Sequence, residues 1–212
     1  MHIGIDFDNT IICYDRVFHK IALEQGLIPN DIPASKQGIR DYLRQVGKEN
    51  AWIKLQGYVY GPRIDGAELF PGVFEFFRFC GRNSIPFCIV SHRTRYPYLG
   101  PKYDLHRSAY GWMEKNNFFE VEKTRLTPEQ VFLELTREKK IDRIKQLGCS
   151  DFIDDLPEFF CEPSFPKNVT CILFDPNKNY APEGSFCRCS TWGEIIHRFR
   201  TMLKPKEQSL QV

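Results

Sequence analysis

Acidic side chains follow the first hydrophobic segment of the chain. Asp6 and Asp8 stand one residue apart at the end of the run that begins at Ile3, and Thr10 follows them. If residues 3–7 form a buried parallel strand, both carboxylates lie near its carboxyl end, where open α/β sheets bind ligands. One carboxylate at such an edge could attack phosphorus while its neighbour transfers protons. Aspartate and asparagine also favour turns for local reasons, so the pair alone does not establish a catalytic site.

The next hydrophobic run, residues 86–90, also ends in polar side chains. Ser91 closes it, and its hydroxyl could donate a hydrogen bond to a phosphate oxygen. His92 and Arg93 come next and could reach a phosphate or a leaving group, although polar loop residues are often simply solvated. We include all three among the candidate substrate-binding residues, together with Thr10.

A lysine and two further acids stand around the third run, residues 152–153. Lys140 opens the helix-like segment KIDRIKQLG, where its ammonium could hold phosphate, and the adjacent Lys139 is its main rival. Asp154 and Asp155 offer hard oxygen ligands suited to Mg²⁺. Phosphoryl transfer needs a nucleophile, a divalent cation, donors to the phosphate oxygens and an acid for the leaving group. The sequence offers a residue for each of these tasks.

The motifs DFDNT, IVS, Lys140 and FIDD resemble, in this order, those of the haloacid dehalogenase superfamily of aspartate-nucleophile phosphatases. The resemblance covers about residues 1–175. The segments FIDDLPE, ILFDPN and STWGEI are more weakly similar to the deoxyribonucleotidase-like branch, which carries a small helical cap. Dehalogenase members lack the second aspartate of DFDNT, so its presence favours phosphate chemistry over carbon–halogen cleavage.

The resemblance implies a role for each matching position. Asp6 would be the nucleophile and a metal ligand, and Asp8 the acid and base, with its backbone carbonyl on the metal. Ser91 and Lys140 would bind phosphate. Asp154 and Asp155 would complete the Mg²⁺ site, with Asp155 the better match to the direct ligand, although the register is open by one residue.

Short hydrophobic runs separated by helical patterns predict an α/β protein with a parallel sheet covered on both faces. With the resemblance, this indicates a Rossmann-like three-layer sandwich with a central parallel sheet and a small helical cap inserted after the first strand. About 80 residues separate the first two runs, more than one crossover helix needs. We therefore expect a catalytic core of residues 1–14 and 69–204, a cap of residues 15–68, and a flexible tail of residues 205–212.

Local patterns predict several further elements. We expect strands at residues 3–7, 86–90, 152–153 and 170–174, helices at residues 17–25, 36–46, 73–80 and 108–115, a helix start at Thr127-Pro128, and a loop at residues 94–106 that could touch substrate. The aromatic side chains of the cap, Trp52, Tyr58 and Tyr60, could stack on a base or sugar, but packing of a small subdomain explains them as well.

Composition narrows the classes of partner. The 212 residues carry a formal net charge of +2, which gives no electrostatic footprint for a nucleic-acid polymer or a membrane surface. No run approaches the roughly 18 apolar residues of a membrane span, and the first residues do not read as a secretory signal. None of the eight cysteines forms a CxxC pair, which favours buried free thiols in a reducing cytosol. We expect a cytoplasmic protein, and its oligomeric state is open.

The function expected from the sequence is that of a Mg²⁺-dependent phosphatase acting on a small phosphorylated metabolite through an aspartyl-phosphate intermediate. A nucleoside monophosphate is the first candidate substrate, and a sugar phosphate the second. The alternatives are a phosphotransferase that uses another acceptor and a non-catalytic phosphometabolite-binding protein on the same fold.

Overall fold

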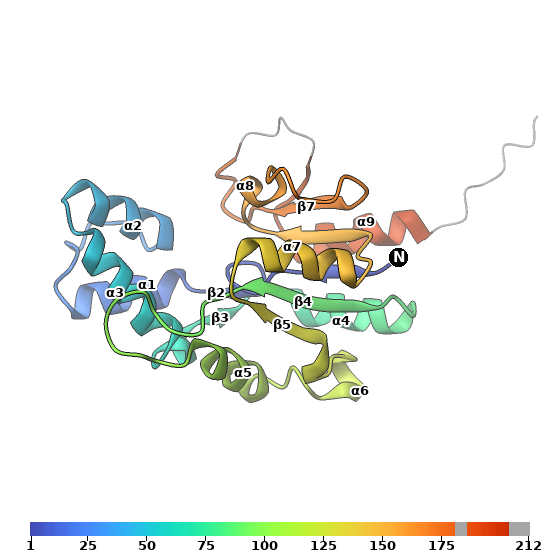
Figure 1. Ribbon diagram of the computed structural model, residues 1–212, viewed down its shortest axis with the longest axis horizontal. Coiled ribbons are helices and arrows are strands. Elements are labelled where there is room, and N and C mark those ends of the chain that lie inside the picture. Colours follow the sequence, from blue (N-terminus) through green and yellow to red (C-terminus); the bar gives the residue numbers. More distant parts are fainter. Residues whose placement is uncertain (181–185, 204–212) are drawn as a thin grey trace, which may run out of the picture.

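A six-stranded parallel sheet forms the centre of the protein (Figure 1). The computed structural model describes residues 1–180 and 186–203. The strand order is β5-β4-β1-β6-β7-β8, and every neighbouring pair is parallel. The strands are β1 (Ile3–Ile5), β4 (Phe87–His92), β5 (Val131–Glu134), β6 (Asp151–Asp154), β7 (Thr170–Phe174) and β8 (Cys187–Cys189). The chain builds outward from β1 on one side and then on the other, so β1 and β6 lie at a topological switch point.

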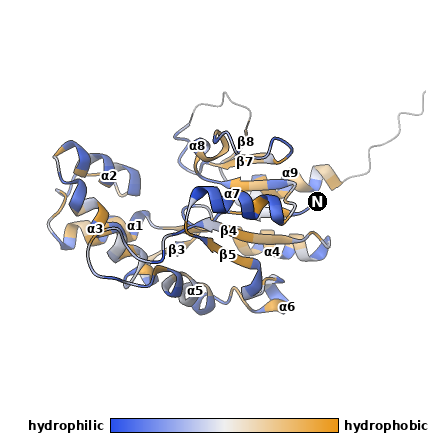
Figure 2. Ribbon diagram, in the orientation of Figure 1, coloured by the Kyte–Doolittle hydropathy of each residue, from blue (hydrophilic) through white to orange (hydrophobic). Residues whose placement is uncertain are grey.

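Successive side chains of the strands enter two different hydrophobic cores. In β4, Phe87 and Ile89 join one core, whereas Cys88 and Val90 join the core on the opposite face. This alternation follows from the pleat of a strand, which points neighbouring side chains to opposite faces. Figure 2 accordingly shows the strands as mainly hydrophobic and the helices as a mixture of hydrophilic and hydrophobic residues. A sheet buried on both faces presents its polar ends, and not its faces, to ligands.

Helices cover both faces of the sheet. The helices outside the segment between β2 and β3 are α4 (Val73–Arg82), α5 (Leu105–Lys115), α6 (Val121–Thr124), α7 (Arg137–Gln146), α8 (Pro157–Phe160) and α9 (Trp192–Leu203). α4 and α9 pack together with α5 on the face of the larger core, and α7 covers β4 and β5 on the other face. The result is the three-layer α/β architecture that the sequence predicts.

Residues 15–66, called the helical insertion below, leave the sheet between two short strands. β2 (Ile12–Cys13) and β3 (Glu68–Leu69) pair in an antiparallel manner at its base. The insertion contains α1 (Asp15–Glu24), α2 (Lys36–Gln45), α3 (Glu49–Tyr60) and a 3₁₀ turn at Ile64–Gly66. Figure 1 shows these helices as a group beyond the end of the sheet. Trp52 is buried against Phe18, with ring centroids 5.2 Å apart, so this aromatic side chain packs the insertion.

Most of the expected elements are present, and the differences concern one expected helix and several strands. All four expected strands and the four expected helices occur, with boundaries that shift by a few residues. The helix start expected at Thr127 is a single 3₁₀ turn, Pro128–Gln130, closed by a capping box and followed directly by β5. The strands β5 and β8, and the β2–β3 pair, were not expected. The division into a core and a cap stays a prediction, and residues 204–212 lie outside the described residues.

Two expectations from composition can be compared with the described residues. All eight cysteines are free thiols, but only four of them are buried, and Cys161 is exposed, so the expectation of buried thiols was too broad. Within residues 1–180 and 186–203, no helix has the length and hydrophobicity needed to cross a membrane.

Candidate active site

The carboxyl ends of β1 and β6 bring three acids together. Ile5 pairs with Ile153, so Asp6 follows one strand where Asp154 ends its neighbour. The backbone N–H of Asp6 donates to the carbonyl of Ile153 at 2.8 Å, which continues the ladder one residue beyond β1. Carboxylate oxygens of Asp6, Asp154 and Asp155 lie within 4.8 Å of one another. The sheet register therefore places these acids at one edge.

Lys140 reaches the acids from α7. Its Nζ donates to Asp6 Oδ1 at 2.6 Å and to Asp154 Oδ2 at 2.7 Å, and the side chain is 5% exposed. The ammonium also lies 4.2 Å from the ring centroid of Phe159, a cation–π contact. Lys139 is exposed on the same helix. The geometry therefore singles out Lys140 of the two lysines that the sequence leaves open.

Burial and crowding shift the protonation of these groups. Burial, reinforced by Asp154 and Asp8 and opposed by Lys140, raises the pKa of Asp6 to about 7. Burial and the charges of Asp154 and Asp6 also raise the pKa of Asp155 well above its ordinary value. Burial alone would lower the pKa of Lys140, but Asp154 and Asp6 raise it, so the lysine stays charged. Lys140 therefore offsets only part of the negative charge at this edge.

The donor set suits a divalent cation. Asp154 uses both of its oxygens on the protein, since Oδ2 accepts from Lys140 and Oδ1 accepts from the backbone N–H of Leu156 at 3.0 Å. Among the described residues, no hydrogen bond or ion pair occupies the carboxylate of Asp155. Oxygen ligands from few carboxylates are what Mg²⁺ prefers. Asp6 and Asp155 are thus the carboxylates best placed to hold the ion, with Asp154 holding Lys140 beside them.

Asp8 lies in a separate environment from Asp6. Arg93 Nη1 donates to its two oxygens at 2.6 and 2.9 Å, and the Tyr14 hydroxyl donates to Oδ1 at 2.7 Å. The side chain of Asp8 is 16% exposed. Asn9, which follows it, has a positive φ of 59°, as expected for the turn that carries the chain away from β1. The hydrogen bonds that orient Asp8 therefore come from Tyr14 and Arg93.

Arg93 differs from its expected role in substrate binding. Besides Asp8, its guanidinium contacts the carbonyls of Tyr60 and Leu105, at 2.9 Å from Nη2 and 3.0 Å from Nε. Its side chain is 2% exposed. Because Nε, Nη1 and Nη2 of Arg93 each donate to a protein acceptor, this arginine holds Asp8, and neither edge of its fork is left unoccupied for a phosphate.

The remaining predicted residues lie near the same edge. Ser91, near the end of β4, and Thr10, after the Asp8 turn, are both buried, and neither hydroxyl has a hydrogen-bond partner within the described part of the chain. A buried unpartnered hydroxyl costs free energy, which makes both candidates for donors to a ligand. His92 points to the face covered by α7, where burial, Lys140 and Arg137 lower its pKa. It is therefore neutral at pH 7.

A cavity of about 320 Å³ adjoins Asp155. One wall comes from α2 of the helical insertion, through Lys36 and Arg40, and the opposite wall comes from residues that follow β6 and β7. Lys36 Nζ lies 5.5 Å from the ring centroid of Tyr60. Burial alone would lower the pKa of Lys36, but Tyr60 and Asp155 raise it, so this lysine is a second cation facing the acidic edge.

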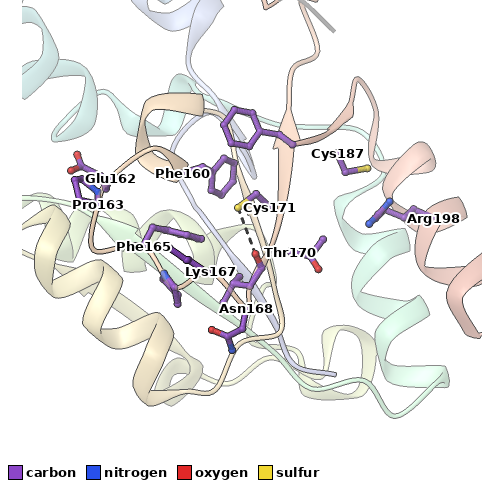
Figure 3. Close-up of a pocket in the computed structure, with 13 residues that line it drawn as sticks. Phe160, Glu162, Pro163, Phe165, Lys167, Asn168, Thr170, Cys171, Cys187 and Arg198 are labelled. Atoms are coloured by element: carbon purple, nitrogen blue, oxygen red, sulfur yellow. Dashed lines mark hydrogen bonds between the residues drawn. The ribbon is translucent and has the colours of Figure 1, made fainter. Parts of the chain in front are cut away.

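Another cavity, of about 740 Å³, lies away from these acids (Figure 3). Its walls are the α8–β7 connection, β7, and Arg198 of α9. The close-up shows Phe160 and Phe165 on one side and Cys187 and Arg198 on the other. None of the predicted site residues lines this cavity, so it is not the candidate active site.

Comparisons with known proteins find hydrolases of similar structure. No protein-family model and no curated relative matches the sequence. A haloacid dehalogenase-superfamily hydrolase from Ehrlichia chaffeensis matches in structure, with a TM-score of 0.56 and 13% identity over 96% of this chain and 97% of that one. A superfamily hydrolase from Deinococcus radiodurans R1, with bound phosphate and sodium, has a TM-score of 0.54 and 14% identity over 94% and 95%. A hydrolase from Pseudomonas syringae has a TM-score of 0.53 and 11% identity over 95% and 98%.

The chain has the fold of these hydrolases. At 11–14% identity the similarity concerns the fold alone, and the chemistry must be argued from the residues of this chain.

Tyr14 and Lys36 are functional candidates on this hydrolase fold that the sequence reasoning did not identify, and the contact that Tyr60 makes was not foreseen. Tyr14 and Tyr60 lie at the two ends of the α1–α3 segment and contact Asp8 and Arg93, respectively. Lys36 faces Asp155 from the start of α2. The aromatic residues of the insertion were noticed in the sequence, but nothing there indicates that Tyr60 offers its backbone carbonyl. The position of Lys36 depends on how α2 packs, which no local pattern encodes.

Proposed function

We propose that the protein is a Mg²⁺-dependent phosphatase that hydrolyses a small phosphorylated metabolite through an aspartyl-phosphate on Asp6. The observation that carries the proposal is the buried network in which Lys140 bridges Asp6 and Asp154 beside the carboxylate of Asp155. Strongly shifted acids around a buried lysine at the carboxyl edge of a parallel sheet are typical of a functional site.

The first half of the proposed reaction transfers the phosphoryl group to the protein. An Asp6 oxygen forms a bond to phosphorus while the bond from phosphorus to the ester oxygen breaks. Asp8, in its protonated form, gives its proton to the departing oxygen, so the product leaves as an alcohol. Lys140 and the Ser91 hydroxyl donate to the phosphoryl oxygens, where charge accumulates.

The second half regenerates the enzyme. Asp8, now a carboxylate, accepts a proton from a water molecule, and the water oxygen attacks the phosphorus of the aspartyl-phosphate. The bond between phosphorus and Asp6 breaks, which releases inorganic phosphate and restores both aspartates. Asp8 must therefore be oriented in both halves of the reaction, and its hydrogen bonds from Tyr14 and Arg93 would hold it in place.

Mg²⁺ held by Asp6 and Asp155 would supply charge neutralisation for the phosphate oxygens. The hydrolase from Deinococcus radiodurans with the same fold has phosphate and sodium bound, which supports this reading of the fold. The raised pKa values of Asp6 and Asp155 support it further, because an added cation would stabilise both carboxylates.

The substrate we propose is a nucleoside monophosphate or a sugar phosphate, with the helical insertion acting as a cap. The cavity of about 320 Å³ between α2 and the acidic edge is of a size for a small metabolite. Its walls carry Phe70, Phe174 and Tyr180, together with the amides of Gln37 and Asn179. Such a mixture of aromatic and amide groups suits a base or a sugar beyond the phosphate.

The test is hydrolysis of an aryl phosphate with Mg²⁺, by the wild type and by Asp6→Asn. We expect the substitution and excess chelator each to abolish turnover. Asp142→Asn is the matched control, because Asp142 is an exposed acid on α7 and its removal should leave the rate unchanged. Activity that survives Asp6→Asn would overturn the covalent mechanism.

A screen of nucleotides, sugar phosphates and phospho-amino acids, read as phosphate release, then identifies the substrate class. Phosphate transfer to an added alcohol in preference to water would indicate a phosphotransferase. Tight binding of a phosphometabolite without any turnover would indicate the non-catalytic alternative.

A further inference from the structure

Arg93 joins three parts of the protein that are distant in sequence. Its Nη1 contacts Asp8 in the turn after β1, and its Nη2 contacts the carbonyl of Tyr60, the last residue of α3. Its Nε contacts the carbonyl of Leu105, the first residue of α5. The guanidinium carbon lies 5.0 Å from the ring centroid of Tyr60. One buried side chain thus contacts the proposed acid and base, the helical insertion and the core.

The other partner of Asp8 stands where the chain enters the insertion. Tyr14, whose hydroxyl donates to Asp8, is the N-cap residue directly before α1. Its ring packs edge to face on that of Tyr60, with centroids 4.8 Å apart. The chain enters the insertion at Tyr14 and reaches the end of its last long helix at Tyr60. Any shift of the insertion relative to the sheet must therefore change the hydrogen bonds of Asp8.

Only an arginine can make this set of contacts. The planar guanidinium has five N–H donors in fixed directions, so one side chain can satisfy a carboxylate and two carbonyls at once. A lysine ammonium at the same place is a single point of charge and could keep Asp8, but not both carbonyls. Tyr60 is the last residue of α3, and the unpaired carbonyls at the C-terminal end of a helix favour a cation.

We propose that Arg93 is a positioning residue that ties the orientation of Asp8 to the seating of the helical insertion on the core. The catalytic half of this inference rests on the proposed phosphatase activity. The structural half, that Arg93 fixes the end of α3 at Tyr60 to the core, is independent of that activity. Opening of the insertion releases Asp8 from its productive orientation, and closure over a substrate restores it, so proton transfer waits for a filled site.

The test compares Arg93→Lys with Arg95→Lys. Arg95 lies two residues further along, pairs with Asp104 and is 61% exposed, so its replacement is the matched control. The first measurement is amide hydrogen exchange over residues 56–66, without substrate or metal. We expect exchange there to be at least about tenfold faster in Arg93→Lys and unchanged in Arg95→Lys.

The second measurement separates positioning of Asp8 from general damage. In single turnovers, release of p-nitrophenol from its phosphate needs little help from an acid, whereas release of an alkyl alcohol needs a proton. Arg93→Lys should slow alkyl release by about 10²-fold, within the usual contribution of general acid catalysis, and slow aryl release much less. In steady-state assays the variant should show little change in KM. Equal losses on both esters, or none, would overturn the positioning role.

A reciprocal variant covers the case in which Arg93→Lys does not fold. Because coupling between two sites acts in both directions, Asp8→Asn should also speed exchange at residues 56–66. Unchanged exchange in this variant would overturn the inference. If the wild type hydrolyses neither ester, the proposed function fails, but the exchange measurements still decide whether Arg93 couples Asp8 to the insertion.

Discussion

Replacing Lys140 by methionine tests the central network through stability alone. Lys140 makes two charged hydrogen bonds, of 2.6 and 2.7 Å, to carboxylates that are buried with it. Methionine keeps most of the side-chain volume but leaves Asp6 and Asp154 facing each other without a cation. The substitution therefore removes the charge while it changes the packing little.

The magnitude follows from these two contacts. A hydrogen bond to a charged group contributes about 1.5–3 kcal/mol, and loss of one partner of a buried ion pair costs about 3–5 kcal/mol. We expect Lys140→Met to lower the free energy of unfolding by about 3–5 kcal/mol at pH 8, or roughly 6–20 °C in Tm for a protein of this size. Burial alone would lower the pKa of Lys140, but its two carboxylate partners raise it above the ordinary value of a lysine. The stabilisation by Lys140 is therefore fully present at pH 8 and is lost only as the pH rises through the raised pKa.

The assay is urea denaturation followed by circular dichroism, with Lys139→Met as the control. Lys139 is exposed, and its replacement should change stability by no more than about 0.5 kcal/mol. Adding Asp6→Asn to Lys140→Met should recover part of the loss, because one buried carboxylate is then removed. A loss below about 1 kcal/mol for Lys140→Met, or equal losses at positions 139 and 140, would refute the network.

Three further outcomes are expected. Gly4→Ala should destabilise the protein by about 1–3 kcal/mol, because the added Cβ would lie 2.5 Å from Phe152 Cδ2. Gly111→Ala, whose Cβ would enter open space on α5, should be neutral or stabilising. Thermal denaturation compares the two variants. Mn²⁺ affinity, measured by calorimetry as a probe for the Mg²⁺ site, should rise by about tenfold in all from pH 6 to pH 8, because Asp6, with a pKa of about 7, must release its proton. A flat profile would argue against Asp6 as a ligand. The ring of His92 should titrate with a pKa below 6.5 in NMR spectra, with His92→Gln to assign the signal. Because the unfolded chain then binds the proton more readily than the folded protein, His92 lowers the stability as the pH falls. A pKa above 6.5 would contradict the burial of His92 beside Lys140.

The ends of the central strands could be predicted from sequence because they obey simple rules. Uninterrupted hydrophobic runs indicate strands buried on both faces, and polar residues at their carboxyl ends meet at one edge of a parallel sheet. Asp6, Ser91 and Asp154 follow this logic and lie within one residue of the carboxyl ends of neighbouring strands. Lys140 needed the order of motifs in the resemblance, because nothing local separates it from Lys139.

The edges of the sheet were harder to predict. β5 is a short edge strand, and three of its four residues are only partly buried. The Thr-Pro-Glu-Gln sequence before it has the signature of a helix start and does form a capping box, but the turn ends after Gln130. Local chemistry was thus recognised correctly, while the length of the helix depended on pairing between β4 and β5, which is not local.

Asp6 and Asp8 are one residue apart, yet the structure gives each a different cation from a different part of the chain. Asp6 is buried in the core with Lys140 of α7, where its position follows from the sheet register. Asp8 lies beyond the strand with Arg93 and Tyr14, where its position follows from the seating of the helical insertion. Paired carboxylates in unlike surroundings can take unlike chemical roles. A rigid site for the nucleophile and a site for the acid and base that depends on the insertion would let the proposed phosphatase hold phosphate at all times and transfer protons only when the cavity is covered.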